Sequence, residues 1–347
     1  MCVDKIFEIE QITRRGAGAK GRRPVQPRLA LVIPCYNEED MLPITFAKIG
    51  AFLQALVEQG LCAPDSYLVF VDDGSKDRTW SLIVERSASE PDRFRGIKLA
   101  SNVGHQNALL SGLFYVTDHC DISVSIDADL QDDLNAIQEM IAAYQAGAEL
   151  VLGVRKSRDT DTRFKRSSAR GFYKMMKWMG VNLVEDHADF RLMSNVALQN
   201  LMQYRERNLF LRGLIPILHQ DIAFVYYDRL ERVAGVSKYP LSKMLMLAWN
   251  GVTSFSIKPL RVITAVGLLV FGCSLLMTLY ALLGSAVGRV VPGWTSTVIP
   301  IYLIGGLNMS AIGVLGEYIG KIFIEVKRRP RFVVDRLTTE RNAVDEP

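Results

Sequence analysis

Short apolar runs alternate with helical apolar spacing along the first half of the chain. Runs rich in β-branched and other apolar residues predict buried strands at 29–34, 67–71, 97–99, 122–126 and 150–154. Between these runs, apolar residues recur at helical spacing over 38–58, 79–88, 107–117 and 133–146. Strands that alternate with helices predict an α/β fold with a mostly parallel sheet.

The pattern changes after about residue 258. Residues 262–283 carry no charge, and a run of this length can cross a bilayer at roughly 20 residues per helix. A second uncharged run covers 290–316, so we expect a two-helix transmembrane hairpin over 260–318, with buried core helices as the alternative. Helical apolar spacing over 241–255 predicts an amphipathic helix on the membrane surface, or a helix packed on the soluble domain.

Basic residues orient the expected hairpin and divide the chain. They flank it on both outer sides, whereas the turn between the two runs carries only Arg289. The positive-inside rule therefore places both ends of the hairpin in the cytoplasm. The expected segments are a basic, mostly disordered tail (1–28), a catalytic domain (29–235), juxtamembrane helices (236–259), the hairpin (260–318) and a cytoplasmic C-terminal tail (319–347).

The composition fits a soluble domain joined to a short membrane domain. Hydrophobic residues make up 49% of the chain and charged residues 22%. The net charge of +4 is too small to argue for nucleic acid as a partner. The five cysteines lack metal-ligand or CxxC spacing, so we expect neither a disulfide framework nor a zinc site.

Acidic loops follow three of the predicted strands. Asn37-Glu38 follows the first, Asp72-Asp73 the second, and the acidic run 127–133 the fourth. Ligands of open α/β sheets bind beyond the carboxyl ends of the strands, so these loops should share one edge. Asp127 and Asp129 are two carboxylates that can reach one hard cation, Mg²⁺ or Mn²⁺. The alternatives are a plain acidic surface turn and, for the other two loops, capped turns that open helices.

These motifs together resemble a known family. VIPCYNEE, VDDGSKDRT and DADLQD are similar to the successive motifs of family 2 glycosyltransferases with a Rossmann-like GT-A fold. DFRLMS, ERNLF, AGVSKY and GEYIG resemble the polyprenyl-phosphate glycosyltransferase subgroup, which includes bactoprenol glucosyltransferases and is similar to dolichyl-phosphate mannose synthases. The resemblance covers roughly residues 29–335. It departs at Val236, where the family often has an acidic residue, and at Ala188, where it commonly has glycine.

The resemblance implies roles for individual residues. The donor nucleotide sugar is assigned to Pro34, Tyr36, Glu38, Asp72, Asp73, Asn102 and Asp127. The divalent cation is assigned to Asp127, Asp129 and Gln131, and catalysis to Asp127, Asp129 and Asp189. Asp189 has an alternative role as a structural carboxylate that pairs near Arg191. His105 is interpreted as a polar contact rather than a general base.

The implied acceptor is a lipid phosphate, which needs no catalytic base. A phosphate monoester has a second pKa of about 6 and is already largely dianionic at neutral pH. Its charge calls for basic side chains, and the resemblance assigns them to Arg155, Arg166, Arg232 and Lys238. The alternative for each is an ordinary solvated basic residue or a contact with anionic lipid.

The implied reaction is an inverting transfer of a sugar, with UDP-glucose favoured, onto undecaprenyl phosphate. It takes place at the cytoplasmic face of a bacterial inner membrane. The alternatives are mannose or an aminoarabinose derivative as the sugar, or a non-catalytic scaffold that binds nucleotide. Gly313, Gly316 and Gly320 permit close helix approach and, with Asn308, suggest a homo-oligomer, with a tetramer as one form.

Overall fold

The computed structural model describes residues 23–156, 187–207, 211–215, 218, 221–228, 253, 256, 258–286 and 294–338. The chain divides into two compact units. The first, called the sheet unit, comprises residues 1–162, 184–238 and 330–347. The second, called the helical unit, comprises 163–183 and 239–329 and is therefore inserted into the first along the sequence. The expected tail 1–28 and the helix predicted over 241–255 lie mostly outside the described residues.

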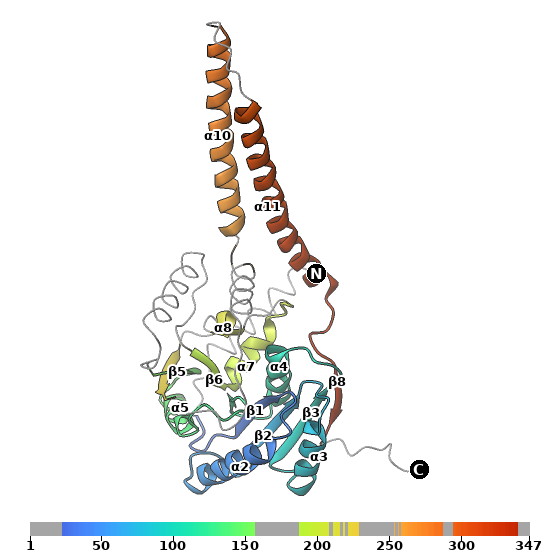
Figure 1. The fold of residues 1–347 in the computed structure, drawn as a ribbon. Coiled ribbons are helices and arrows are strands. Elements are labelled where there is room, and N and C mark those ends of the chain that lie inside the picture. The colour runs from blue at the N-terminus through green and yellow to red at the C-terminus, as the bar shows by residue number, and fades with distance from the viewer. Residues whose placement is uncertain are drawn as a thin grey trace, which may run out of the picture. The chain divides into compact units, whose positions relative to one another are not determined.

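The sheet unit is built on one mixed sheet of eight described strands, in the order β7-β5-β6-β4-β1-β2-β3-β8. Figure 1 labels β5, β6, β1, β2, β3 and β8 of this sheet. The strands are β1 Leu29–Cys35, β2 Tyr67–Asp72, β3 Phe94–Leu99, β4 Ile122–Ser125, β5 Leu150–Arg155, β6 His187–Ser194, β7 Ile222–Tyr227 and β8 Val334–Leu337. The five strands expected from the apolar runs are confirmed, and so is the α/β class. The sheet is mixed because β6 runs antiparallel to β4 and β5, and β8 antiparallel to β3.

Helices lie in the connections between successive strands and cover both faces of the sheet. They are α2 Leu42–Glu58, α3 Thr79–Ser89, α4 His105–Val116, α5 Ala136–Gln145, α7 Asn195–Gln203 and α8 Leu211–Leu214. Helix α2 buries Ile49 and Leu53, one helical turn apart, as an amphipathic helix should. Helix α7 begins where the Ser194 side chain accepts a hydrogen bond from the amide of Ala197, which caps its N-terminus.

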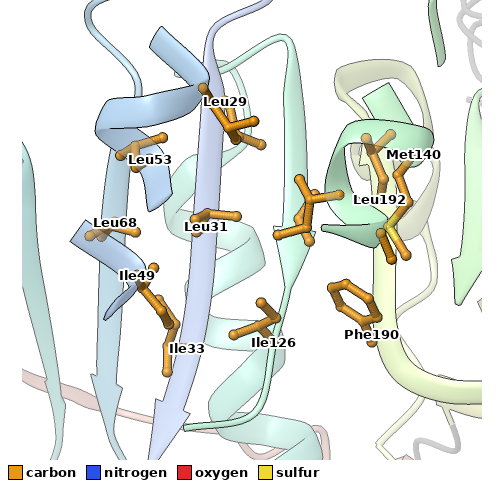
Figure 2. Packing of buried hydrophobic residues seen from close by; sticks show 14 of the residues in the cluster. Leu29, Leu31, Ile33, Ile49, Leu53, Leu68, Ile126, Met140, Phe190 and Leu192 are labelled. Atoms are coloured by element: carbon orange, nitrogen blue, oxygen red, sulfur yellow. The ribbon is translucent and has the colours of Figure 1, made fainter. Parts of the chain in front are cut away.

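The core forms between β1 and the helices on either side of it. Leu29, Leu31 and Ile33 of β1 belong to one buried cluster with Ile49 and Leu53 of α2 (Figure 2). Because side chains alternate along a strand, Val32 points to the opposite face of the sheet, where α4 packs. A Cβ added at Gly112 of α4 would lie 2.4 Å from Cγ1 of Val32. The helix therefore sits directly on the strand, and only glycine fits at the contact.

The last described strand returns from the C-terminal segment to the edge of the sheet. Strand β8 pairs with β3, and the amide of Ala100 donates to the carbonyl of Val333 at 2.9 Å. Phe332 packs edge-to-face on Phe114 of α4 at 5.8 Å between ring centroids. Arg331 donates to the carbonyl of Tyr204 at 2.6 Å. Residues 319–347, expected as a tail, thus contain the end of a long helix and one strand of the sheet.

The helical unit contains two long helices, α10 Lys258–Ala286 and α11 Trp294–Lys327, which contact each other. They overlap the two uncharged runs of the sequence. Within the described residues, no helix is both long enough and apolar enough to span a membrane. The transmembrane hairpin therefore stays a prediction. Large apolar side chains on both helices are nevertheless exposed, among them Leu268, Leu276, Met309 and Ile312.

Candidate active site

Three loops meet at the carboxyl edge of the sheet, as the sequence predicted. Strand β1 lies between β4 and β2, so the loops that follow these strands are neighbours. The loop after β1 and the loop after β2 are bonded to each other through several side chains. The amide of Asn37 donates to Oγ of Ser75 at 2.9 Å, and the amide of Glu38 donates to Oγ1 of Thr79 at 2.9 Å. The two motifs therefore fix each other's conformation.

Asp73 ties this pair of loops to a third one, before α4. Its two carboxylate oxygens accept the amides of Val103 and Gly104 at 2.8 and 3.0 Å. Burial raises the pKa of Asp73, although the two amide hydrogen bonds oppose the rise. The loop after β2 passes so close to the third loop that a Cβ on Gly74 would lie 2.6 Å from the carbonyl carbon of Ser101. Gly74 also has φ of +65°, so both its conformation and its surroundings require glycine.

The remaining donor-site candidates differ in how far they reach solvent. Tyr36 is 43% exposed, and Asn102 is exposed as well, so both are open to a ligand. Glu38 is half-buried, and Pro34 is buried at the end of β1. Asp72 is fully buried, and its Oδ1 accepts the amide of Ser75 at 3.0 Å, which closes the turn after β2. In this structure Asp72 therefore supports the turn.

The loop after β4 presents Asp127 and Asp129. Thr45 of α2 donates to the carbonyl of Ala128 at 2.9 Å and holds the loop from below. Leu130 has φ of 51°, an uncommon conformation for a residue with a side chain and a sign of a tightly specified turn. Gln131 is buried, and its amide lies 3.3 Å from Oδ1 of Asp129.

Negative charge is concentrated around Asp127. Desolvation raises the pKa of Asp127 to about 6; the charges of Asp189, Asp132 and Asp129 act in the same direction, and His105 opposes them. Such a group of carboxylates is stabilised by a bound cation. The described residues contain no group of three or more His, Cys, Asp or Glu placed to hold a metal ion. Asp127 and Asp129 thus offer two carboxylate ligands to a hard cation, and Gln131, phosphate oxygens or water would supply the others.

Asp189 of β6 forms the centre of a charged cluster beside Asp127. Its Oδ1 accepts Nη2 of Arg191 at 2.6 Å, and its Oδ2 accepts Nη2 of Arg212 at 3.0 Å. Nε2 of His105 lies 3.6 Å from Oδ2 of Asp189 and 3.6 Å from Oδ1 of Asp127. Burial by itself would raise the pKa of Asp189, but His105 and the two arginines together hold it well below the usual range. Asp189 thus stays ionised and pairs with Arg191, which is the structural alternative expected for it.

Arg191 is completely buried, and burial lowers the pKa of its guanidinium. Its Nε and Nη1 atoms have no hydrogen-bond partner among the described residues. A buried donor without a partner costs free energy, so the single strong bond to Asp189 must offset that cost. Arg191 and Asp189 stand two positions apart on one strand and so share a face of the sheet.

A second charged group lies at the end of β5. Tyr227 of β7 donates its hydroxyl to Oδ1 of Asp132 at 2.5 Å, and Nη2 of Arg155 lies 3.5 Å from the same oxygen. Arg155 also donates from Nε to the Tyr227 hydroxyl at 3.4 Å. The Arg155 side chain is 31% exposed, whereas Asp132 is buried at 4%. Arg155 is thus held at the same sheet edge as Asp127.

The other three basic residues expected at the acceptor side, Arg166, Arg232 and Lys238, lie outside the described residues. Sequence reasoning missed Arg212 and Tyr227. Tyr227 follows an apolar run that could have been recognised as a strand. Arg212 stands in the short helix α8, and only its contact with Asp189 in the folded structure reveals its role.

The chain matches known proteins over most of its length. The model of the family described as Glycosyl transferase family 2 matches residues 30–202. The uncharacterized glycosyltransferase YkoT of Bacillus subtilis (strain 168) is 48% identical, over 89% of this chain and 92% of the relative. The SfII prophage-derived bactoprenol glucosyl transferase of Shigella flexneri is 39% identical, over 89% of this chain and 98% of the relative.

Among solved structures, a mannosyltransferase from Pyrobaculum calidifontis in complex with GDP-Man and Mn²⁺ covers 88% of this chain and 94% of its own. Its sequence identity is 15% and its TM-score 0.41. These values are too low for the likeness to bear on function.

Proposed function

Because the chain belongs to glycosyl transferase family 2, and is thus a glycosyltransferase, we propose that it moves a sugar from a nucleotide sugar onto a polyprenyl phosphate. The relatives named as bactoprenol glucosyl transferases support this acceptor. Within that class we favour UDP-glucose as donor and undecaprenyl phosphate as acceptor.

The observation that carries the proposal is the charge pattern at the carboxyl edge of the sheet. Asp127 and Asp129 need a cation, which a nucleoside diphosphate would share. Arg155 stands at the same edge, held by Asp132 and Tyr227, and offers positive charge to a second phosphate. An acidic pair beside a positioned arginine suits a reaction between two phosphate-bearing molecules.

The donor side is assigned to the loops after β1, β2 and β3. Tyr36 and Asn102 are exposed to contact the nucleotide, and Asp73 fixes the two loops between which it would lie. Asp127 and Asp129, with Gln131 as a third candidate, would hold Mg²⁺ or Mn²⁺. When bound, the cation supplies charge neutralisation for the departing diphosphate.

The chemical step is a single displacement. An oxygen of the acceptor phosphate forms a bond to the anomeric carbon as the bond from that carbon to the β-phosphate oxygen breaks. The nucleoside diphosphate leaves and the sugar is inverted at that carbon. The acceptor oxygen arrives already ionised, so the protein supplies position and charge rather than a base. Asp189, committed to Arg191 and Arg212, is accordingly assigned to positioning and not to proton transfer.

Attachment to the cytoplasmic face of a bacterial inner membrane belongs to the same proposal. Its support is the uncharged run 262–283 and the exposed side chains of α10, such as Leu268 and Leu276, which are 66% and 69% exposed. We further propose a homo-oligomer, for which a tetramer is one form. No described residue lies within 4 Å of a Cβ added at Gly313 or Gly316, so this side of α11 can accept another helix closely.

Transfer assays on the full-length protein in detergent test the function. Undecaprenyl phosphate and Mn²⁺ are mixed with one radiolabelled donor at a time: UDP-glucose, GDP-mannose or a nucleotide-linked aminoarabinose. We expect labelled lipid from UDP-glucose, and none when undecaprenol without its phosphate replaces the acceptor. Transfer from GDP-mannose alone would overturn the choice of sugar, and absence of transfer from every donor would leave only the scaffold alternative.

The cation assignment is tested by substitution. Asp129→Asn should abolish transfer while the protein stays folded, because the donor set loses one of its two carboxylates. The matched control is Asp92→Asn, an exposed carboxylate just before β3, at the opposite end of that strand from the site. Full activity of Asp129→Asn in the presence of Mn²⁺ would contradict the assignment.

A further inference from the structure

Two arginines bind one carboxylate in the cluster around Asp189, and they differ in burial. The Arg191 side chain is 0% exposed, whereas the Arg212 side chain is 42% exposed, and each contacts a different oxygen of Asp189. Arg191 alone suffices to neutralise the buried carboxylate. Arg212 is thus not needed to neutralise Asp189, and its side chain is the one of the two that reaches solvent.

The position of Arg212 is fixed from two directions. It belongs to the short helix α8, whose first amide, that of Leu211, donates to Oε1 of Gln106 at 3.0 Å. Gln106 follows His105 in the first turn of α4, and His105 lies 3.6 Å from both Asp127 and Asp189. Contacts thus run from Arg212 through Asp189 and His105 to Asp127. The guanidinium is held beside the acidic pair rather than on a remote surface.

We propose that Arg212 is a phosphate-binding residue of this active site, and that Asp189 is the residue that positions its guanidinium. The inference rests on the proposed transfer between two phosphate-bearing molecules. A guanidinium carries five N–H donors in a planar fork, more than one carboxylate oxygen can accept, so it can bind Asp189 and a phosphate together. The phosphate belongs either to the diphosphate of the donor or to the lipid acceptor, and the chemistry of recognition is the same for both.

Steady-state kinetics of Arg212→Ala and Arg212→Lys in the full-length protein identify the source. A lost charge-assisted hydrogen bond should raise one KM by about 10-fold to 100-fold. A rise in the KM for UDP-glucose assigns Arg212 to the donor diphosphate, and a rise in the KM for undecaprenyl phosphate assigns it to the acceptor. Arg212→Lys should retain part of the affinity because it keeps the charge but loses the fork. The control is Arg205→Ala, because Arg205 is an exposed arginine between α7 and α8.

Chemical rescue separates binding from a structural role. Added guanidinium ion should restore part of the activity of Arg212→Ala and leave Arg205→Ala unchanged. Asp189→Asn should raise the same KM as Arg212→Ala does. The double variant should have a KM no higher than that of Arg212→Ala alone, because both changes remove the same positioned guanidinium. Kinetics of Arg212→Ala within threefold of the parent, or a loss confined to kcat without rescue, would overturn the proposal.

The inference is separable from the proposed function. If the parent protein transfers no sugar, the proposed function fails. Calorimetric titration with UDP and with micelles that contain undecaprenyl phosphate then tests whether Arg212 binds phosphate. Weaker binding of either ligand by Arg212→Ala than by Arg205→Ala supports the assignment. Equal binding of both ligands by the two variants refutes it.

Discussion

Removal of one hydroxyl group, in Tyr227→Phe, tests the network that holds Arg155. The hydroxyl donates to Oδ1 of Asp132 at 2.5 Å in a place where the Tyr227 side chain is 2% exposed. Desolvation and the charge of Asp132 raise the pKa of Tyr227, so the phenol keeps its proton and acts as donor. Phenylalanine preserves the ring, which packs edge-to-face on Phe190 at 5.1 Å between centroids. The substitution therefore removes the hydrogen bonds of the hydroxyl to Asp132 and from Arg155 and leaves the ring packing in place.

The expected cost follows from burial and charge. A hydrogen bond to a charged, buried group contributes about 1.5–3 kcal/mol to stability, and Asp132 is 4% exposed. Near the midpoint, each kcal/mol shifts Tm by roughly 2–4 °C for a unit of this size. We therefore expect the Tm of Tyr227→Phe to fall by about 3–12 °C. We also expect a higher KM for the lipid phosphate, because Arg155 loses its bond to the hydroxyl at 3.4 Å.

Differential scanning fluorimetry of the purified protein measures the shift. Tyr226→Phe is a matched control, since Tyr226 is the preceding residue of the same strand and is 55% exposed. A surface change of this kind should move stability by no more than about 0.5 kcal/mol. If both variants melt within about 1 °C of each other, the hydroxyl does not hold Asp132 as described, and the positioning of Arg155 needs another explanation.

Three further outcomes are expected. Gly74→Ala should weaken UDP binding in calorimetry by at least tenfold, because its Cβ would lie 2.6 Å from a backbone atom. Gly104→Ala should weaken binding less, since Gly104 has φ of +87° but no described atom lies within 4 Å of its added Cβ. The affinity for Mn²⁺ in the presence of UDP should fall as pH drops through about 6, because the raised pKa of Asp127 lets a proton compete with the cation there. Constant affinity from pH 7 to pH 5 would contradict this prediction. Gly112→Ala should lower Tm by an amount equivalent to about 1–3 kcal/mol. Gly267→Ala, whose added Cβ has no described atom within 4 Å, should leave Tm unchanged.

The strands that the sequence predicted are short runs of mainly apolar residues, although β7, which is also apolar, was not predicted. Strands β1 and β2 are buried at every position, so their pattern is a continuous apolar run. Strand β6 was missed because it carries Asp189 and Arg191. Their charges interrupt the apolar pattern of a buried strand, although the two side chains form an ion pair inside the fold. Strand β8 was missed because its short polar sequence is mostly exposed and pairs with a distant partner.

The candidate site, too, could be predicted from the sequence only in part. Loops after β1, β2 and β4 could be placed at one edge, because parallel strands align their carboxyl ends. Contacts across strands could not be foreseen, since they depend on register. Asp132 meets Tyr227 only because β7 pairs with β5 in one particular alignment, which sets Arg155 opposite Tyr227.

The pairing of β8 with β3 also has a consequence for the order in which the protein is made. Seven strands leave the ribosome by Tyr227, but the edge of β3 receives its partner only after both long helices have been synthesised. Until then, β3 presents an unpaired edge, which is a template for misassembly with other chains. The sheet can therefore be completed only after translation has passed Leu337. A nascent protein stalled within α11 would carry the whole predicted site on an unfinished sheet.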